Sequence, residues 1–414
     1  MSNSKKLLFV VMFLLVIVVC LMPNLDIEDG EVSYREVTAS SQTENKQPMT
    51  VTEYEHDKYI HLDKYDVGVT TEASPEVVGL PDEIEELLST MTIEEKVAQM
   101  LFIKNDDRFD ASILEEYPVG GMILFSSDFR GESSESLTDK LASFQDASEI
   151  PLLIGVDEEG GDVVRLSMYS ALADYRFLSP RELYYEGGYD AVREDTIAKS
   201  KLLLSYGINV NFAPVCDVSL DPSEFMYNRS FGISPEATAD YINVVVNSME
   251  AEHMGSVMKH FPGYGSNGDT HTCIVRDYRD YDSFVNGDFL PFIEGINQGA
   301  DCVLVSHNIV ECIDSEMPAS LSGKVIGILR NDLEFDGVII TDDLMMDGVS
   351  DYFSEGESAV MAIIAGNDMI LSTDYSLQYE SVLAAVYDGR ITEERIDESV
   401  TRILLWKYEL GLIK

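Results

Sequence analysis

From about residue 81, the chain alternates between short apolar runs and longer amphipathic stretches. The apolar runs show no polar alternation, which is typical of strands covered on both faces. They occupy residues 99–103, 120–125, 152–156, 210–215, 257–261, 302–306, 338–341 and 368–372. The stretches between them, such as 240–253, 323–335 and 357–366, are amphipathic and predict helices. Strands alternating with helices predict parallel pairing, and eight such units predict a single (β/α)8 barrel of the TIM type over residues 81–414.

Ahead of the first strand, residues 80–100 (LPDEIEELLSTMTIEEKVAQM) predict helix. Thr92 and Glu95 have the spacing of a capping box, which satisfies backbone N–H groups at the start of a helix.

The N-terminus has a different pattern. Lys5 and Lys6 precede an unbroken apolar run over residues 7–22, which Pro23 closes. A basic start followed by an apolar run is typical of a secretory signal, and the run is near the lower length limit of a spanning helix. No small-residue cleavage site follows, so we predict an uncleaved signal anchor at residues 1–23, with the lysines inside. Cys20 leaves lipid attachment open as the alternative.

Residues 24–80 are rich in acidic, Ser, Thr and Gln residues and show neither the strand period nor the helix period. Such composition predicts a flexible, acidic stalk. Together with the anchor, it predicts a bacterial protein that is exported and held at the outer face of the cytoplasmic membrane.

The chain has 75 acidic against 28 basic residues, a net charge of −47. A polyanion of this kind repels nucleic acid and anionic lipid headgroups, so we expect neither as a partner, and membrane contact through the N-terminal segment only. Apart from Cys20 the chain has four cysteines, too few for a disulfide scaffold; a bridge between Cys273 and Cys312 is left open. The sequence does not predict the oligomeric state.

Polar residues collect where the predicted strands end. Asp157 follows the third run, Lys259 and His260 lie within the fifth, and Asp342 follows the seventh. Because the carboxyl ends of all strands in a parallel barrel face one side, these residues predict a convergent polar pocket at the mouth of the barrel.

Several motifs in these positions resemble glycoside hydrolase family 3, in particular its β-N-acetylhexosaminidase branch. They are residues 157–165 (DEEGGDVVR), 211–217 (NFAPVCD), 229–232 (RSFG), 259–265 (KHFPGYG), 269–271 (DTH), 341–346 (TDDLMM) and 402–412 (RILLWKYELGL). The resemblance covers about residues 82–414. It implies a retaining, exo-acting hydrolase that removes terminal β-linked N-acetylglucosamine from peptidoglycan fragments or chitin-type oligosaccharides.

The resemblance also implies catalytic roles. The family's nucleophile falls on Asp342, with Asp343 as the rival, although the next residue off a strand usually points away from the barrel axis. His271 would act as acid and base, oriented by Asp269. A neighbouring carboxylate suits this role, because it raises the pKa of histidine and selects the ring nitrogen that carries the proton. The mechanism needs no metal or cofactor, and the histidine spacings fit no metal site.

Substrate binding is implied for Asp157, Arg165, Arg229, Lys259 and His260, which would hydrogen-bond the sugar hydroxyls. His307 could join them or merely cap its strand. In the glycine-rich segment of residues 259–272, we interpret Gly263, Gly265 and Gly268 as the source of loop mobility.

The sequence departs from the family pattern at several positions. Tyr264 stands where the family commonly has His, the loop to His271 is one residue short, and Glu158 and Asp162 replace a usual Gln and Arg. These changes leave the preferred substrate and the loop geometry open.

Two other functions remain: a β-glucosidase or β-xylosidase of the same family, and a non-catalytic surface sugar-binding protein. The former usually carries a second α/β domain that supplies the acid, and we expect none here. The natural aglycone, and water against phosphate as the acceptor, are not predicted.

Overall fold

The computed structural model describes residues 79–105, 111–268, 275–346, 349 and 353–414. They belong to one unit, Val77–Lys414. The predicted anchor at 1–23, and the stalk at 24–80 except its last two residues, lie outside the described residues. Among the helices that are described, none combines the length and the apolar character needed to cross a membrane.

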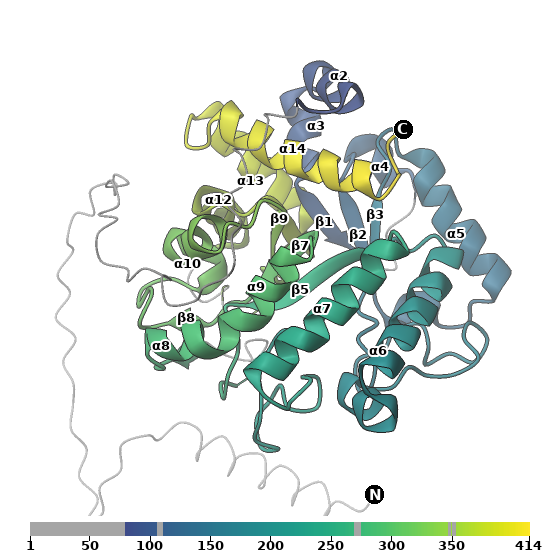
Figure 1. Ribbon diagram of the computed structural model, residues 1–414. Coiled ribbons are helices and arrows are strands. Elements are labelled where there is room, and N and C mark those ends of the chain that lie inside the picture. The colour runs from purple at the N-terminus through teal and green to yellow at the C-terminus, as the bar shows by residue number, and fades with distance from the viewer. Residues whose placement is uncertain (1–78, 106–110, 269–274, 347–348, 350–352) are drawn as a thin grey trace, which may run out of the picture. The chain divides into compact units, whose positions relative to one another are not determined.

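Eight parallel strands form the centre of the unit, in the order β10-β1-β2-β3-β4-β5-β7-β9 (Figure 1). They are β1 (Leu101–Lys104), β2 (Gly121–Leu124), β3 (Leu153–Val156), β4 (Val210–Asn211), β5 (Gly255–Phe261), β7 (Cys302–Val305), β9 (Val338–Thr341) and β10 (Ile370–Ser372). Each coincides with one predicted apolar run. The prediction of an eight-stranded parallel α/β architecture is therefore confirmed.

The barrel is almost closed. The two end strands of the sheet, β9 and β10, meet through an isolated parallel bridge between Ile340 and Met369. The amide of Thr341 donates to the carbonyl of Met369 at 3.2 Å, and the amide of Asp368 donates to that of Ile339 at 2.8 Å. We call this junction the seam. At the seam, fewer residues are paired through the backbone than between the other neighbouring strands.

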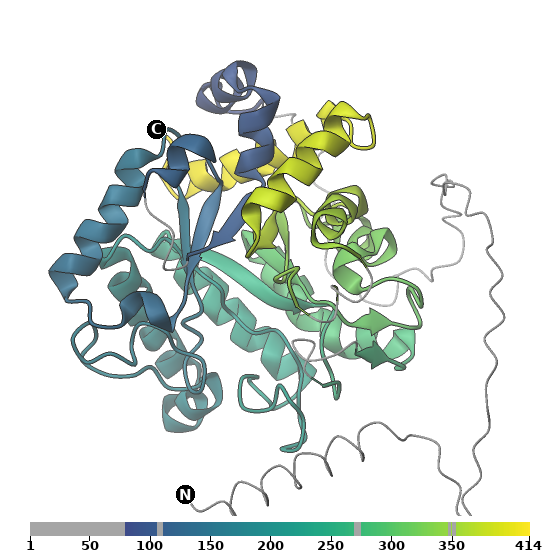
Figure 2. The ribbon, with the colours of Figure 1, turned by 180° about the vertical axis from the view of Figure 1, so that it is seen from behind.

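Helices surround the strands, as Figures 1 and 2 show from opposite sides. The α-helices are α2 (Asp82–Thr90), α3 (Ile93–Gln99), α4 (Ile113–Glu116), α5 (Ser134–Ala147), α6 (Pro180–Ser205), α7 (Pro235–Ala251), α8 (Tyr281–Ser283), α9 (Phe289–Asn297), α10 (Gly323–Gly327), α12 (Glu355–Ala365), α13 (Tyr375–Tyr387) and α14 (Glu393–Glu409). Short 3₁₀ or π turns are η2 (Ser126–Phe129), η3 (Phe284–Asp288), η4 (Ala319–Leu321) and η5 (Ile328–Asp332).

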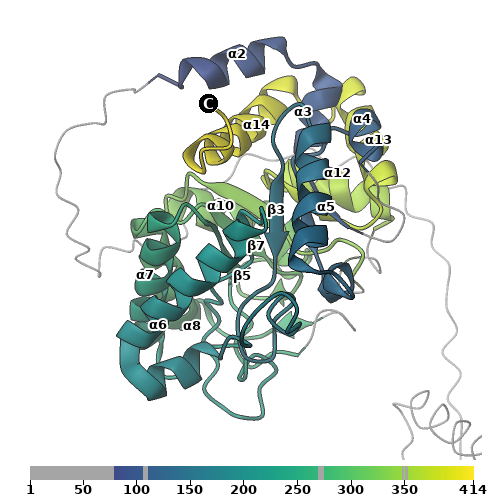
Figure 3. The same cartoon turned by 90° about the vertical axis from the view of Figure 1, so that its right-hand side faces the viewer.

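The predicted helix at 80–100 is two helices. Thr92 accepts a hydrogen bond from the amide of Glu95 at 3.3 Å, and Glu95 accepts one from the amide of Thr92 at 2.7 Å. This capping box therefore begins α3 and separates it from α2, because a cap residue is not itself helical. Both helices contact α14, which lies across the same end of the barrel (Figure 3).

A second sheet was not predicted. It consists of β6 (Arg276–Asp277) and β8 (Ile309–Val310), which pair in parallel outside the barrel. Two residues are too few to show a period in the sequence. This small sheet joins the segments that follow β5 and β7.

Candidate active site

Predicted site residues lie at the carboxyl ends of the barrel strands. Asp157 is the first residue after β3, and Asp342 is the first after β9. Lys259 and His260 are among the last three residues of β5. Arg229 comes from the segment between β4 and α7. Since the strands are parallel, their carboxyl ends lie on one side of the barrel, which is the predicted mouth.

A chain of ion pairs joins these strand ends. Lys259 Nζ lies 2.6 Å from Asp157 Oδ1 and 2.7 Å from Glu159 Oε1. Glu159 in turn accepts two hydrogen bonds from Arg229, from Nε at 3.0 Å and from Nη2 at 2.7 Å. We call Asp157, Glu159, Arg229 and Lys259 the mouth cluster. Its two carboxylates balance its two cations, which is how charges are tolerated away from water.

Burial and pairing act against each other in this cluster. Burial alone would raise the pKa of Glu159, but the charges of Arg229 and Lys259 overcome it and hold that pKa well below the usual range. Burial alone would lower the pKa of Arg229, and Glu159 reverses this, so its pKa is raised. Both groups therefore stay charged across the physiological range.

Arg165 extends the cluster towards solvent. Its Nη2 lies 3.7 Å from Asp157 Oδ2, and its side chain is 28% exposed. Its Nε is buried and has no hydrogen-bond partner among the described residues. An unpaired buried donor is costly unless something else accepts from it.

His260 is held on both sides. Its Nδ1 lies 2.7 Å from Asp217 Oδ2, and its Nε2 lies 3.3 Å from Arg229 Nη2. Because an arginine can only donate, Nε2 must accept, and the proton of the ring then sits on Nδ1, donating to Asp217. Asp217 also accepts from the amide of Tyr264 at 2.8 Å, so one buried carboxylate positions both the histidine and the start of the following loop.

Glu158 and Glu159 are adjacent but face different partners. Glu158 is fully buried and accepts hydrogen bonds from the amides of Arg165 and Leu166, both at 2.8 Å, and from Ser167. Its carboxylate therefore folds the segment after β3 back on itself. The departure from the family pattern at residue 158 serves this loop, and its carboxylate is turned away from the mouth cluster.

Asp342 and Asp343 are also adjacent, and their carboxylates have different hydrogen-bond partners. Asp343 is engaged locally, accepting from the amide of Met345 at 3.0 Å and from the hydroxyl of Thr373 at 2.7 Å. Asp342 is half-buried; its amide donates to Val305 on β7 at 2.9 Å, and its Oδ1 accepts from the amide of Asp343 at 2.9 Å.

His307 is a structural bridge. Its Nε2 lies 3.0 Å from the backbone carbonyl of Asp343, and its Nδ1 lies 2.7 Å from Ser320 Oγ. The carbonyl can only accept, so Nε2 carries the proton and Nδ1 accepts from the serine. These bonds join the segment after β7 to η4 and to the segment after β9, and both interpretations of this fully buried residue stay open.

The glycine-rich loop after β5 is anchored at its beginning. Gly263 and Gly265 have φ of +116° and +52°, and a Cβ would lie 2.2 Å from Asp288 Oδ1 at the first and 2.3 Å from Arg279 Cζ at the second. Arg279 also donates to the carbonyl of Gly263 at 3.1 Å. Left-handed backbone and close packing account for the choice of glycine at these two positions, and the interpretation that they provide mobility stays a prediction. Gly268, by contrast, has open space around it.

The base of this loop carries a second buried cluster. Arg279 pairs with Asp277 at 2.7 Å and with Asp288 at 2.6 Å. Burial raises the pKa of Asp288 to about 7 even though Arg279 opposes the shift. Asp269 and His271, the predicted acid/base pair, lie outside the described residues, so their roles stay predictions.

Sequence reasoning missed two members of the arrangement. Glu159 joins two predicted binding residues, and Asp217 orients a third. Both stand inside the family motifs, Glu159 three residues after β3 and Asp217 six residues after β4, and that position is the available signal. Among the described cysteines, Cys216, Cys302 and Cys312 are free thiols. Cys273 lies outside the described residues, so the bridge left open between Cys273 and Cys312 stays untested. Within the described part of the chain, no group of three or more His, Cys, Asp or Glu side chains is placed to hold a metal ion.

Comparison with known proteins identifies the family. Residues 92–405 match the family described as "Glycosyl hydrolase family 3 N terminal domain". Beta-hexosaminidase A of Pseudoalteromonas piscicida is 31% identical over 328 residues, covering 72% of this chain and 55% of its own length. Beta-hexosaminidase of Nitrosomonas eutropha is 32% identical over 295 residues, covering 68% of this chain and 83% of its own.

A solved structure is similar as well. The glycoside hydrolase family 3 beta-N-acetylglucosaminidase from Paenibacillus sp. str. FPU-7 superposes with a TM-score of 0.72 at 31% identity, covering 78% of this chain and 63% of that protein. The chain thus spans little more than half the length of the first of these relatives. With the family match over most of its described residues, the chain belongs to glycoside hydrolase family 3.

Proposed function

We propose that the protein is a retaining, exo-acting glycoside hydrolase that removes terminal β-linked N-acetylglucosamine, or a related N-acetylhexosamine, from peptidoglycan fragments or chitin-type oligosaccharides. The observation that carries this proposal is the family match together with relatives that are named beta-hexosaminidases. The mouth cluster supports it, because paired charges that keep part of their surface open are suited to hydrogen-bonding the hydroxyls of a sugar. Arg165, whose side chain is 28% exposed beside Asp157, supplies further N–H donors for a sugar hydroxyl.

In the proposed mechanism, Asp342 attacks the anomeric carbon of the sugar. The glycosidic bond breaks, the leaving oxygen takes a proton from His271, and a covalent glycosyl-aspartate forms. His271 then removes a proton from water, which attacks the same carbon and releases the sugar with its original configuration. Asp342 is favoured over Asp343 because it is the first residue after β9, at the position where the family motif places the nucleophile.

The direct test is an assay of p-nitrophenyl N-acetyl-β-glucosaminide and p-nitrophenyl β-glucoside side by side. We expect release of p-nitrophenol from the first and little from the second. Preference for the glucoside would favour the β-glucosidase alternative, and absence of activity on both would favour a sugar-binding protein.

The acid/base pair is tested with leaving groups of different quality. A p-nitrophenolate departs almost without protonation, whereas a sugar alkoxide requires it. His271→Ala should therefore slow sugar-linked substrates far more than the aryl glycoside, and should let the glycosyl-Asp342 intermediate accumulate for detection by mass spectrometry. Asp269→Asn should act in the same direction, within the ~10²–10⁴-fold range of general acid–base catalysis. Equal losses on both substrates would contradict this role.

We also propose that residues 1–23 anchor the protein in the cytoplasmic membrane and that residues 24–80 hold the barrel off its outer face. The apolar run behind two lysines supports the first part, and the acidic composition of the following segment supports the second. The full-length protein should remain with membranes after alkaline carbonate treatment. A mature N-terminus beyond residue 22 would contradict the anchor, and one that starts at a lipid-modified Cys20 would establish the lipoprotein alternative.

A further inference from the structure

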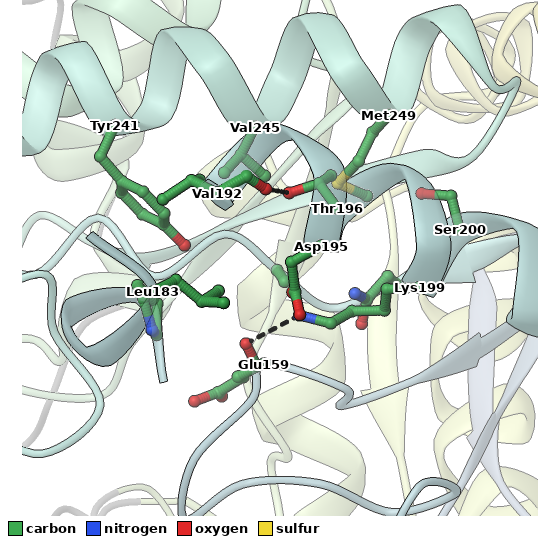
Figure 4. A pocket seen from close by; sticks show the side chains of 13 residues that line it. Glu159, Leu183, Val192, Asp195, Thr196, Lys199, Ser200, Tyr241, Val245 and Met249 are labelled. Carbon is green, nitrogen blue, oxygen red and sulfur yellow. Dashed lines mark hydrogen bonds and ion pairs between the residues drawn. The ribbon is translucent and has the colours of Figure 1, made fainter. Parts of the chain in front are cut away.

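A small pocket of about 20 Å³ lies behind the mouth cluster, between α6, α7 and the strand ends. Figure 4 shows Asp195 and Lys199 of α6 pointing towards Glu159, with Tyr241 and Met249 of α7 on the other wall. Glu159 thus faces two environments. Its carboxylate belongs to the mouth cluster, and its backbone carbonyl belongs to the pocket.

Lys199 holds the backbone side of Glu159. Its Nζ donates to the carbonyl of Glu159 at 3.2 Å and lies 3.2 Å from Asp195 Oδ2, one helical turn earlier. The ammonium also lies 5.1 Å from the centre of the Phe177 ring. The side chains of Lys199 and Asp195 are only 10% and 9% exposed, so this is a buried cation used to bind a backbone carbonyl.

The hydrogen bond from Lys199 to the Glu159 carbonyl affects the site because Glu159 lies in the turn that follows β3. The Glu159 side chain must reach Arg229 and Lys259 at once, with distances of 2.7 Å to each. A displacement of the backbone at Glu159 would carry the carboxylate away from one of them. The amides of Glu159 and Gly160 donate to the carbonyl of Val163, at 3.0 Å and 3.1 Å. The charge-assisted hydrogen bond from Lys199 holds the Glu159 carbonyl against such a displacement, since breaking it would leave a polar group unpaired in a buried pocket.

We propose that Lys199 is a positioning residue for the sugar site. By fixing the Glu159 peptide, it keeps the carboxylate between Arg229 and Lys259 and so sets where these two cations meet the substrate. This inference rests on the proposed function for its kinetic consequence. It does not require Lys199 to touch the sugar.

Three variants separate positioning from simple support of the helix. Lys199→Met removes the donor, Lys199→Arg keeps one, and Asp195→Asn breaks the ion pair while leaving Lys199 in reach of the carbonyl. We expect Lys199→Met to raise KM for p-nitrophenyl N-acetyl-β-glucosaminide on the order of tenfold with a smaller change in kcat, because interactions common to bound substrate and transition state are lost. Lys199→Arg should recover most of this loss, and Asp195→Asn should leave KM near its normal value.

A matched control lies on the same helix. Lys201 is 63% exposed and pairs with Glu252 at 3.3 Å, so Lys201→Met should leave both constants unchanged. Equal increases in KM for Lys199→Met and Asp195→Asn would overturn the proposal, because the ion pair would then matter only as a helix contact. A lower kcat at constant KM for Lys199→Met would also overturn it, since it would indicate only a smaller folded fraction.

A crystal structure of Lys199→Met tests the inference independently of the reaction. The expected result is a Glu159 carboxylate displaced from Arg229 or from Lys259. An unchanged Glu159 would refute the positioning role even in an active enzyme. Conversely, a displaced Glu159 in a protein with no activity on N-acetyl-β-glucosaminides would uphold it and refute the proposed function instead.

Discussion

Two clusters of buried charges lie at opposite ends of the barrel and are built differently. The mouth cluster stands where strands end. The other, which we call the seam cluster, comprises Asp368 and the arginines at 330, 395 and 402, and Asp368 lies two residues before β10, at the amino-terminal end of the strands. In the mouth cluster two carboxylates share two cations, whereas in the seam cluster one carboxylate has three arginines around it.

The seam cluster is closed to solvent at its centre. Asp368 is fully buried and accepts from Arg330 at 2.6 Å, from the amide of Ile339 at 3.0 Å and from Ser399 at 2.8 Å. Arg330 also donates to the carbonyl of Gly337 at 2.8 Å, so its guanidinium is bound within the protein. These bonds tie α14 and η5 to the seam, where backbone pairing between the end strands is limited.

The two clusters differ in net charge, because the seam cluster has a surplus of positive charge and the mouth cluster is balanced. Burial lowers the pKa of Arg330. The positive charges of Arg402 and Arg395 lower it further, while the carboxylate of Asp368 opposes the shift. The contacts that the arginines make at the seam offset their mutual repulsion. The mouth cluster has no such surplus, because its two carboxylates balance its two cations. Partial exposure does not separate the clusters: Asp157 and Arg229 keep 15% and 18% of their side chains exposed, and the three seam arginines keep 15%, 20% and 25%. Position separates them, since the mouth cluster stands at the carboxyl ends of the strands and the seam cluster at the amino-terminal ends. Changes at the mouth should affect activity, and changes at the seam should affect stability.

The largest effect is expected at Asp342. Replacement by Asn removes the charge that attacks the anomeric carbon, so turnover should fall on the order of 10⁴-fold or more while urea unfolding stays unchanged. Activity on p-nitrophenyl N-acetyl-β-glucosaminide measures the first and the denaturation midpoint measures the second. Near-normal turnover would transfer the role to Asp343 or another residue of the mouth.

Asp368→Asn should show the opposite behaviour. Three arginines would lose their shared carboxylate, and breaking a buried ion pair typically costs about 3–5 kcal/mol of unfolding free energy, measurable in urea. The KM of the remaining folded enzyme should not change. Asp397→Asn is the control; it lies on α14, the helix that carries two of the seam arginines, is 50% exposed, and its pair with Lys96 should contribute less than ~1 kcal/mol. If Asp368→Asn lowered the unfolding free energy as little as the control does, the seam cluster would have no stabilising role.

Glu159→Gln provides the counterpart at the mouth. The amide keeps the shape but removes the charge between Arg229 and Lys259, so kcat/KM should fall by about 10–100-fold, as two cations shift away from the sugar. The unfolding free energy should fall by less than for Asp368→Asn, by about 1–2 kcal/mol, because Lys259 keeps Asp157 as a partner. If both variants lost stability equally and KM stayed constant, the distinction between the clusters would fail.

Lys407 shows what a buried charge does without a carboxylate partner. It is fully buried on α14, donates to Gln99 Oε1 at 2.6 Å, and has no ion-pair partner among the described residues. Burial lowers its pKa from 10.5 to about 7. Between these values the unfolded chain binds more protons than the folded one, so this group makes stability rise with pH from about 7 to 10.5, with its full cost present below pH 7.

Lys407→Met should remove this cost and stabilise the protein by about 1–2 kcal/mol at pH 7, the smallest of these effects, because Gln99 loses a donor at the same time. Urea unfolding from pH 7 to 10 should show a flatter rise in the variant than in the parent protein. An unchanged slope would mean that the lysine is not the group that titrates.

Much of the barrel was predictable because its signals are local. An apolar run without alternation is a property of each strand alone, and all eight runs became strands. The separation of α2 from α3 follows from a capping box that was also recognised, although the helix had been predicted as continuous. The pairing of β6 with β8 was not predictable, because it depends on segments more than thirty residues apart that carry no period of their own.

Site membership was predictable by position, and orientation was not. Asp157 and Lys259 could be placed at the mouth because parallel strands end on one side, whereas Arg229 was placed there only through the family resemblance. Glu158 and Glu159 are the same residue type in adjacent positions, yet one binds three amides of its own loop and the other joins two cations from distant segments. The tertiary structure decided between them, because the direction of a side chain in a turn depends on the backbone of that turn and on the partners that β5, the β4–α7 segment and α6 bring to it.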